Sequence, residues 1–280
     1  MGTPLAINTN IGSLNVQRSL NYRGRLLNNS IERLSSGLKI NSAADDAAGL
    51  AVSENLTAQT RGFKQGLENA NDAVSILSTT EGSYDTISDI LIRMRELSVQ
   101  SANDSLGTVE RGFLNTEFTQ LIGEITRVSD VAEYNGIKLL DGTGGDGAGN
   151  FVFQVGTRNT ANDRIGITLG DIDAAALGVA GSSVDTLVNS QNSIATIDAA
   201  LTTLATSRAT IGSTVNQLTA AVDNLSITIE NLSAANSQIK DADLAAESAD
   251  FTRNQVLMQA GTSMLSQANS IPQLALQLLG

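Results

Sequence analysis

The sequence contains no cysteine and no histidine. Their absence excludes thiolate nucleophiles, imidazole acid–base catalysis, disulfides, and the usual side-chain ligands of zinc and haem. Tryptophan is also absent, and aromatic residues make up only 3% of the chain, so stacking platforms for bases or sugars are not expected. We therefore expect a protein that is not an enzyme and that needs no cofactor.

Proline and charge are both scarce. Pro4 and Pro272 are the only two prolines, where average usage gives roughly fourteen. Because proline breaks helix interiors, the stretch between them permits long helices. Charged residues are 16% of the chain, and such a surface suits a protein that packs against others. The net charge of -12 repels phosphate backbones, so no nucleic-acid partner is expected.

The most regular pattern covers residues 194–239, where apolar residues recur in steps of three and four. A period of 3.5 residues indicates a helix that packs in a coiled-coil manner, about 70 Å long. Arg208 and Asn236 are the two polar interruptions of this seam. Two interpretations of Arg208 are open: a side chain that pairs with a helix carboxylate nearby, or one half of an ion pair between subunits.

The N-terminal half contains candidate partner helices. One is predicted to begin at Ser42 as its N-cap and to resume its pattern at Tyr84 after Glu81-Gly82. A turn is predicted at NDSLG (103–107), and a second helix follows from there. The seam residues of the first helix are Phe63, Leu67, Ala70, Val74 and Leu77, and those of the second include Val109, Phe113, Phe118, Leu121, Ile122, Ile125 and Val128.

The middle of the chain has a different texture. FVFQV (151–155) and RIGITL (164–169) alternate in polarity, which predicts a β-hairpin. GTGGDG (142–147) satisfies the dinucleotide pattern GxGxxG, but a strand follows it instead of a helix, so we interpret it as a loop. The adjacent Asp45 and Asp46 diverge by about 100° on a helix. A cap or a charge pair at a subunit contact therefore explains them better than shared acid–base chemistry.

Both ends of the chain are amphipathic. Residues 254–280 contain no charge, and Leu257, Met264, Ile271 and Leu278 recur there every seven residues. Amides and hydroxyls interrupt this stretch, so no membrane insertion is expected. Pro272 is predicted to bend the helix, and Gly261 to allow close approach of a neighbouring backbone. The N-terminus, MGTPLAINTNIGSLNVQRSL, lacks a basic segment followed by an apolar run, so no cleaved signal peptide is expected.

Several segments resemble bacterial flagellin, in the order that this family has them. In the N-terminal half they are LAINTNIGSLNVQRSL, SIERLSSGLKINSAADDAAGLAVSENL, LIRMRELSVQSAND and EYNGIKLLDG. In the C-terminal half the segment is AAESADFTRNQVLMQAGTSMLSQANSIPQLALQLL. The resemblance covers about residues 5–170 and 190–279.

The resemblance implies a mainly α fold. A long, coiled-coil-like helical bundle forms a rod (D1) with a small β-hairpin region, and the terminal helices form an inner-tube domain (D0). The expected boundaries are 1–42 and 241–280 for the two D0 segments, 43–170 and 191–240 for the two D1 segments, and 171–190 for a short connection that replaces outer domains.

The resemblance also implies a function. Flagellins are structural subunits that polymerise with themselves into the extracellular filament of the bacterial flagellum, used for motility. They are exported unfolded by the flagellar type III apparatus without a cleaved signal peptide, and their terminal segments fold and pack on assembly. Implied partners are the export apparatus, an export chaperone on the C-terminal segment, and hook-associated and cap proteins. A hook–filament junction protein, which shares similar terminal segments, is the nearest alternative.

We expect the assembly interface on the apolar stripes of the two ends, because the uncharged C-terminal stripe has no partner until subunits stack. The expected residues are Ile7, Ile11, Leu14, Leu27, Ile31, Leu34, Leu257, Gly261, Met264, Ile271 and Leu278.

A second role is implied for LIRMRELSVQ (91–100). In flagellins from several bacterial groups this patch binds the animal receptor TLR5, and the resemblance carries this contact over to Arg93, Leu97 and Glu117. Ile92 stands where the receptor-active pattern commonly has a polar residue. The alternative is that the charged residues of this stretch serve filament packing alone.

Overall fold

The computed structural model describes residues 9–277, and their side chains as far as residue 270. Within this range the chain forms the helices α1 (Ile11–Ser36), α2 (Ala47–Ser101), α3 (Thr108–Val131), α4 (Leu187–Lys240) and α5 (Leu244–Gln277). The short strands are β1 (Glu133–Tyr134), β2 (Ile137–Lys138), β3 (Asn150–Gln154) and β4 (Arg164–Thr168), with a 3-10 turn η1 (Ala161–Asp163) before β4. The mainly α fold class predicted from the sequence is confirmed.

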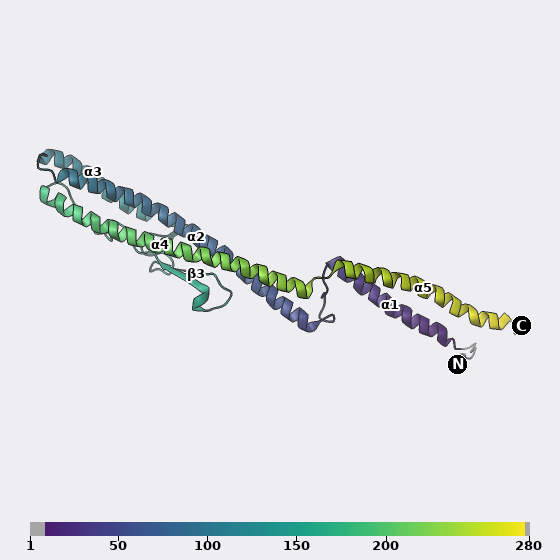
Figure 1. Cartoon of the computed structure of the whole chain (residues 1–280). Coiled ribbons are helices and arrows are strands. Elements are labelled where there is room, and N and C mark those ends of the chain that lie inside the picture. Colours follow the sequence, from purple (N-terminus) through teal and green to yellow (C-terminus); the bar gives the residue numbers. More distant parts are fainter. Residues whose placement is uncertain (1–8, 278–280) are drawn as a thin grey trace. The chain divides into compact units, whose positions relative to one another are not determined.

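The described residues group into two compact units. Unit 1 contains the residues up to 58 and those from 231 onward, and unit 2 contains residues 59–230. In unit 1, α1 and α5 lie side by side (Figure 1). In unit 2, α2, α3 and α4 run alongside one another, and β3 lies against them (Figure 1). The predicted D0 and D1 boundaries stay predictions.

A seam of buried side chains with a 3.5-residue period holds unit 2 together. On α2 the fully buried residues step by three and four, and α4 faces them with the same spacing, as a coiled-coil pair requires. This confirms the long helix predicted for residues 194–239. The buried residues are Ala70, Ala73, Leu77, Thr80, Tyr84, Ile87, Leu91 and Met94 on α2, and Ile197, Ala200, Leu204, Ile211, Thr214 and Leu218 on α4.

The interruption predicted at Glu81-Gly82 does not exist in the seam. Thr80 is fully buried and fills the place between Leu77 and Tyr84. Its hydroxyl donates to the carbonyl of Ile76 at 3.0 Å, so the buried polar group is satisfied within its own helix. A threonine can therefore occupy a seam position that an apolar pattern search leaves empty.

Ser42 is not the N-cap of α2, contrary to the sequence prediction. The Asp46 carboxylate accepts from the backbone N–H of Gly49 at 2.9 Å, and the Asp46 carbonyl accepts from Leu50 at 3.0 Å. These are the two bonds of an N-cap residue. Asp45 instead closes the preceding turn, because its carboxylate accepts from the backbone and hydroxyl of Ser42. These contacts hold the pKa of Asp45 below its usual value.

Residues 170–186 are more than a weakly patterned connection. Their apolar side chains enter the core of unit 2, and Val184 is tied to three helices. Its N–H donates to Asn115 on α3 at 2.8 Å, and its carbonyl accepts from Ser101 on α2 at 2.6 Å and from Ser190 on α4 at 3.3 Å. The buried residues are Ile172, Ala174, Leu177, Val179 and Val184.

Two β-hairpins follow α3. The predicted one pairs β3 with β4 in antiparallel register, with Phe151 opposite Ile167. The other, β1 with β2, was not predicted from the sequence. Asn135 (φ 51°) and Gly136 (φ 77°) connect its strands, and positive φ at both positions is the signature of a type I′ turn. The Asn-Gly dipeptide is the signal that could have revealed it.

Threonine hydroxyls on α4 are bonded to their own helix. Thr202, Thr206 and Thr210 each donate to the carbonyl four residues earlier, at 2.9, 2.9 and 3.1 Å. These side chains are exposed, so the helix presents their methyl groups to solvent while the hydroxyl protons are engaged.

Leu91 and Ile92 are adjacent on α2 but differ in burial, which gives a matched pair of variants. Leu91 is fully buried and Ile92 is 48% exposed. We expect Leu91→Ala to lower the free energy of unfolding by about 2–5 kcal/mol, because it removes packed methylene groups and leaves a cavity. Ile92→Ala should change it by less than about 0.5 kcal/mol. Urea unfolding followed by circular dichroism measures both, and equal losses would contradict the assigned seam.

Candidate assembly and recognition surfaces

In unit 1, α1 and α5 pack through a seam in which polar and small residues alternate with half-buried apolar ones. Side chains turned toward the partner helix are buried or half-buried and recur every three or four residues. Those on α1 are Ser13, Val16, Leu20, Arg23, Leu27, Ser30 and Leu34, and those on α5 are Phe251, Asn254, Met258, Gly261, Leu265 and Ala268. The 3.5-residue period of unit 2 thus reappears with less completely buried side chains.

Polar contacts set the two helices antiparallel. Near the start of α1, Asn10 donates from its side chain to the carbonyl of Ala268 at 2.8 Å. Further along, Arg23 donates to Asn254 at 3.3 Å. Near the end of α1, Arg33 lies 3.7 Å from Glu247. α1 therefore begins beside the later part of α5.

A neighbouring residue packs closely against Gly261, as predicted, but the contact is with the side chain of Leu20 and not with a backbone. A Cβ placed on Gly261 would lie 2.6 Å from Cδ2 of Leu20. Any larger residue at this position must displace Leu20, since real Cβ atoms do not approach so closely. Gly261 therefore belongs to the contact between α1 and α5 within one chain.

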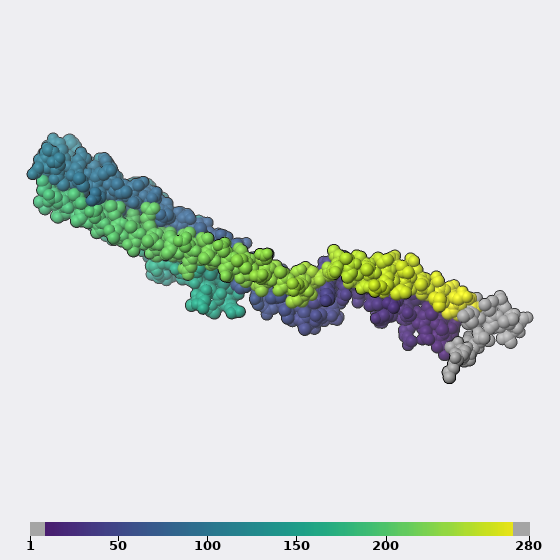
Figure 2. Space-filling model, in the orientation of Figure 1, coloured from purple at the N-terminus to yellow at the C-terminus, as the bar shows by residue number. Residues whose placement is uncertain are grey.

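The remaining predicted assembly residues are half-buried, exposed, or outside the described part of the chain. Leu27 and Leu34 are half-buried in the α1–α5 pair. The exposed group, with exposed fractions of 39–63%, consists of Ile11, Leu14, Ile31, Leu257 and Met264. Ile7 and Leu278 lie outside the described residues, as does the side chain of Ile271. Part of the α5 surface turned to the viewer in Figure 2 (yellow) has no other described segment over it.

Unit 1 has little apolar core of its own. Among the described side chains of α1 and α5, the fully buried ones are Ser13, Ser30 and Asn254, all polar. In the rest of the described unit, Ile40 is a buried apolar residue. Burial of apolar area is the main favourable term in folding. This helix pair therefore depends less on its own core than unit 2 does.

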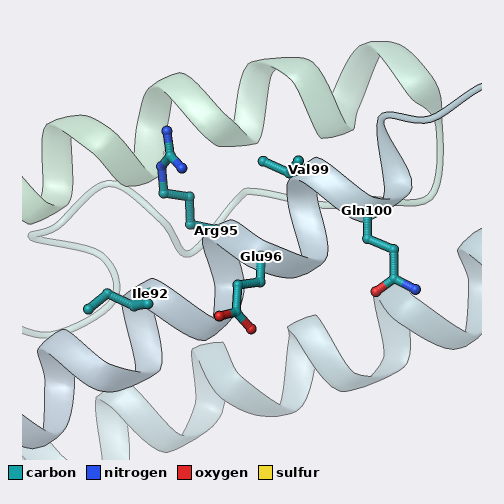
Figure 3. A pocket seen from close by; sticks show the side chains of 5 residues that line it. All are labelled: Ile92, Arg95, Glu96, Val99 and Gln100. Carbon is teal, nitrogen blue, oxygen red and sulfur yellow. The ribbon is translucent and has the colours of Figure 1, made fainter.

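Unit 2 carries an open groove on the outer side of α2, with a volume of about 510 Å³. Figure 3 shows Arg95 reaching toward α4, while Glu96 and Gln100 point to the opposite side. The Arg95 guanidinium bonds Asp198 at 2.7 Å, and this contact raises the pKa of Arg95. The lining residues are Ile92, Arg95, Glu96, Val99 and Gln100.

The three predicted receptor contacts lie close to this groove but differ in access. Arg93 bonds Glu117 on α3 at 2.8 Å and Glu96 at 3.0 Å, and about half of each of these side chains is exposed. Leu97 is fully buried, so it contacts the core and not solvent. Of the three, only Arg93 and Glu117 can meet a partner without the helices separating.

Arg208, the exception on the α4 seam, pairs with carboxylates of α2 in the same chain. Its guanidinium lies 2.6 Å from Glu81 and 3.2 Å from Asp85, and the hydrogen bond to Glu81 raises its pKa. The interpretation of a side chain paired with a helix carboxylate is confirmed. The second oxygen of Glu81, Oε2, is buried and accepts no hydrogen bond within the described part of the chain.

The glycine-rich loop has no helix after it, which confirms the loop interpretation. Asp146 accepts from Ala148 and Asn150 within the loop, and these bonds lower its pKa. Across residues 9–277, no group of three acidic side chains is arranged to hold a metal ion. None of the described helices is long and apolar enough to cross a membrane.

Family models match both halves of the chain. The model for the bacterial flagellin N-terminal helical region matches residues 7–144, and that for the C-terminal helical region matches residues 194–279. The paired terminal helices and the long coiled-coil seam are thus those of a flagellar filament protein. The chain belongs to the bacterial flagellin family.

Curated relatives match along the whole chain. A flagellin of Halalkalibacterium halodurans is 40% identical over 275 residues, which are 98% of this chain and 100% of the relative. A flagellin of Treponema pallidum is 38% identical over 287 residues, with the same coverage. A flagellar filament core protein of Brachyspira hyodysenteriae is 36% identical over 286 residues, again with that coverage.

Solved structures share the fold. A crystal structure of Bacillus cereus flagellin is 26% identical, with a TM-score of 0.51, and the match covers 56% of this chain and 88% of that one. A structure described as a flagellar hook-associated protein of Vibrio parahaemolyticus has a TM-score of 0.58 at 18% identity, covering 70% and 100%. The latter shows a common fold alone.

Membership of the family settles the broad function. Flagellin is a structural protein family, so this chain is a structural subunit of the flagellar filament and not an enzyme. The filament is a polymer of such subunits on the outside of the cell. The family and its fold therefore confirm the resemblance seen in the sequence.

Tyr84, beside Glu81 on the α2 seam, makes the stability of unit 2 sensitive to alkaline pH. Its side chain is 1% exposed, and burial, aided by the charge of Glu81, raises its pKa from 10.0 to about 12. The folded state thus holds the phenolic proton more tightly than the unfolded state. This contribution is present below pH 10 and is lost as the pH rises toward 12.

We expect the parent chain to lose about 2 kcal/mol more free energy of unfolding than Tyr84→Phe between pH 9 and pH 11.5. Phenylalanine has no proton to lose, whereas other ionisations affect both chains alike. Urea unfolding at the two pH values measures the difference. Parallel pH dependences in parent and variant would show that Tyr84 ionises normally in the folded protein.

Proposed function

We propose that this filament subunit assembles through unit 1, with the exposed apolar flanks of α1 and α5 packing against neighbouring copies. The observation that carries the proposal is the exposure of large apolar side chains beside the α1–α5 seam. Met264 is 62% exposed on α5, and Ile11 is 63% exposed on α1. Neither is part of the contact between the two helices.

Burial of these flanks gives assembly a driving force. Full burial of one Leu, Ile or Met side chain contributes about 1.5–3 kcal/mol. Each subunit offers several such side chains, and the contacts repeat with every copy added. Residues 254–280 carry no charge, so identical copies can approach here without like-charge repulsion.

We further propose that α1 and α5 complete their folding on assembly. The buried side chains described in these two helices are serine and asparagine, and their apolar contact residues are only half-buried. The pair therefore gains less from apolar burial than unit 2 does, and isolated helices are marginal in water. Neighbouring copies supply the missing apolar contacts, so ordering and burial occur together. Amide hydrogen exchange in unit 1 should then be fast in the monomer and slow in the filament.

The exposed α5 flank also supports the proposed contact of an export chaperone with the C-terminal segment. A chaperone that covers Leu257 and Met264 before assembly would prevent premature association. Export of the unfolded chain by the flagellar apparatus without a cleaved signal peptide, and contact with hook-associated and cap proteins, are part of the same proposal and rest on the family.

A hook–filament junction protein is the alternative to the filament subunit. The shared fold with the Vibrio structure supports only the architecture that the two classes have in common. Flagellins match this chain over 98% of its length, which favours the filament subunit. A junction protein would not extend filament seeds indefinitely, so seeded growth separates the two functions.

We also propose that the monomer is recognised by the receptor TLR5 through Arg93 and Glu117. Both side chains are about half exposed and bonded to each other across α2 and α3. Together they present a fixed pair of opposite charges beside the apolar side chain of Ile92 and the groove in Figure 3. A partner with a complementary pattern of charges can bind such an arrangement specifically.

Seeded polymerisation tests the assembly surface. We expect the double variant Leu257→Asn with Met264→Asn to raise the critical concentration for filament growth at least about tenfold, since it removes apolar area at each new contact. Gln255→Ala, an exposed change on the same helix, is the control and should polymerise like the parent. Negative-stain electron microscopy and sedimentation give the readout. Normal growth of the double variant would place the interface elsewhere.

A receptor reporter assay with purified monomer tests recognition. We expect Arg93→Ala to lower the signal by tenfold or more, because a charged hot-spot residue at an interface contributes about 2 kcal/mol or more. Arg127→Ala removes another exposed arginine, paired with Glu124 on α3, and should leave the signal unchanged. A silent parent protein, or equal loss in both variants, would end this proposal.

A further inference from the structure

The buried seam between α2 and α4 does not by itself define how far one helix is displaced along the other. Its residues repeat every 3.5 positions with similar apolar side chains. Examples are Leu77, Tyr84 and Leu91 on α2, and Leu218, Ile211 and Leu204 on the antiparallel α4. A shift of one heptad, about 10.5 Å, brings a new set of apolar residues into the same places. Polar contacts distinguish the native alignment. Val184 bonds both Ser101 on α2 and Ser190 on α4 at one end of the pair, and ion pairs lie further along.

Three ion pairs link these helices within unit 2, at Arg95 and at Arg208, and both points belong to one alignment. Arg95 on α2 bonds Asp198 on α4 at 2.7 Å. Ten residues earlier on α2, Asp85 lies 3.2 Å from Arg208, which is ten residues later on α4. In antiparallel helices, a move of ten residues back along α2 matches a move of ten residues forward along α4. The two contacts therefore report the same alignment.

Shifted alignments lose both contacts. If α4 moves by one heptad in either direction, Ser78 or Ile92 takes the position opposite Arg208 that Asp85 holds. In the same shifts, Gln191 or Ala205 takes the position opposite Arg95 that Asp198 holds. The same shifts put Val74 or Ser88 in the place of Glu81. No carboxylate takes any of these positions, so both guanidinium groups lose the partners that they have in the native alignment.

The pair at Arg208 distinguishes alignments more than it stabilises the fold. Glu81 and Arg208 are about one third exposed, and Glu81 Oε2 is buried without a hydrogen-bond partner in the described structure. Removing two charges from water costs about as much as their attraction returns, whereas a charge left without its partner is strongly unfavourable. Polar residues in coiled-coil seams fix alignment in this way.

We propose that Arg208, held by Glu81 and Asp85, fixes the register of α4 on α2, and that Arg95 with Asp198 sets the same register further along. The consequence is uniformity: every copy of the chain folds its rod with one alignment, so that copies present identical surfaces. This role is separate from the assembly surface of unit 1.

Disulfide trapping tests the register, because the chain has no cysteine of its own. Ser88→Cys with Ala205→Cys lies between the two contacts and reports the native register. Ser88→Cys with Gly212→Cys, and Val74→Cys with Gly212→Cys, report shifts of one heptad in the two directions. In the parent background, mild oxidation should cross-link only the native pair.

The charge-free background carries Glu81→Leu, Asp85→Asn, Arg95→Gln, Asp198→Asn and Arg208→Leu. We expect its helical circular dichroism signal to be retained, the native cross-link to fall at least twofold, and one of the shifted cross-links to rise at least tenfold. If the native pair alone still cross-links, the apolar seam fixes the register and the proposal is wrong. Loss of the helical signal would also overturn it, because the ion pairs would then supply stability and not alignment.

Two controls separate register from general charge effects. Glu124→Gln with Arg127→Gln removes an ion pair within α3 and should leave the native cross-link unchanged. Glu81→Arg and Arg208→Glu, combined with Asp85→Asn, reverse the seam pair and should also retain the native register, since opposite charges still meet and no carboxylate repels the new one. A shifted register in either control would contradict the assigned role of Arg208. Cross-linking is done on monomers, so its outcome is independent of whether unit 1 drives polymerisation.

Discussion

The 3.5-residue period of buried side chains is the constraint on which the rest of the structure depends. It makes α2 and α4 pack along their whole shared length in unit 2, and α3 joins them through Phe118 and Ile125. The same period recurs between α1 and α5, where the buried residues are polar and the apolar ones are only half-buried. The same spacing of contact residues therefore occurs in unit 2, which has a continuous apolar core, and in unit 1, which has not. This difference in core content underlies the proposed division between a rod that folds alone and ends that complete their folding in the polymer.

Much of the helical fold could be predicted because long periodic helices leave strong signals in a sequence. The sequence alone predicted the helix at 194–239, the hairpin at 151–169 and the resemblance of both ends to flagellins. The hairpin β1–β2 was missed because each strand has only two residues, too few to show alternation. The N-cap was misplaced because serine and aspartate both favour that position, and only backbone geometry distinguishes Ser42 from Asp46.

The candidate surfaces were less predictable, since exposure depends on which face of a helix its neighbour covers. A heptad stripe in α5 was visible in the sequence, but the residues that contact α1 belong to a neighbouring stripe that includes Asn254 and Met258. Leu257 and Met264 are exposed for that reason. In α2, Leu97 sits in the core while Arg93, four residues earlier, reaches solvent. A sequence pattern identifies an amphipathic helix, yet its partner determines which residues remain available.

The threonines of α4 illustrate how a surface can be polar in composition and still easy to dehydrate. A hydroxyl that already donates to the carbonyl four residues earlier, as in Thr206 and Thr210, gives up little when a second surface displaces the surrounding water. Its methyl group then makes dispersion contacts that a charged side chain would prevent. Because this face of α4 has few charges and its hydroxyls are already hydrogen-bonded, it is compatible with water and costs little free energy to desolvate. A filament subunit meets water before assembly and other copies after it. At these threonines the free energies of the two environments differ little.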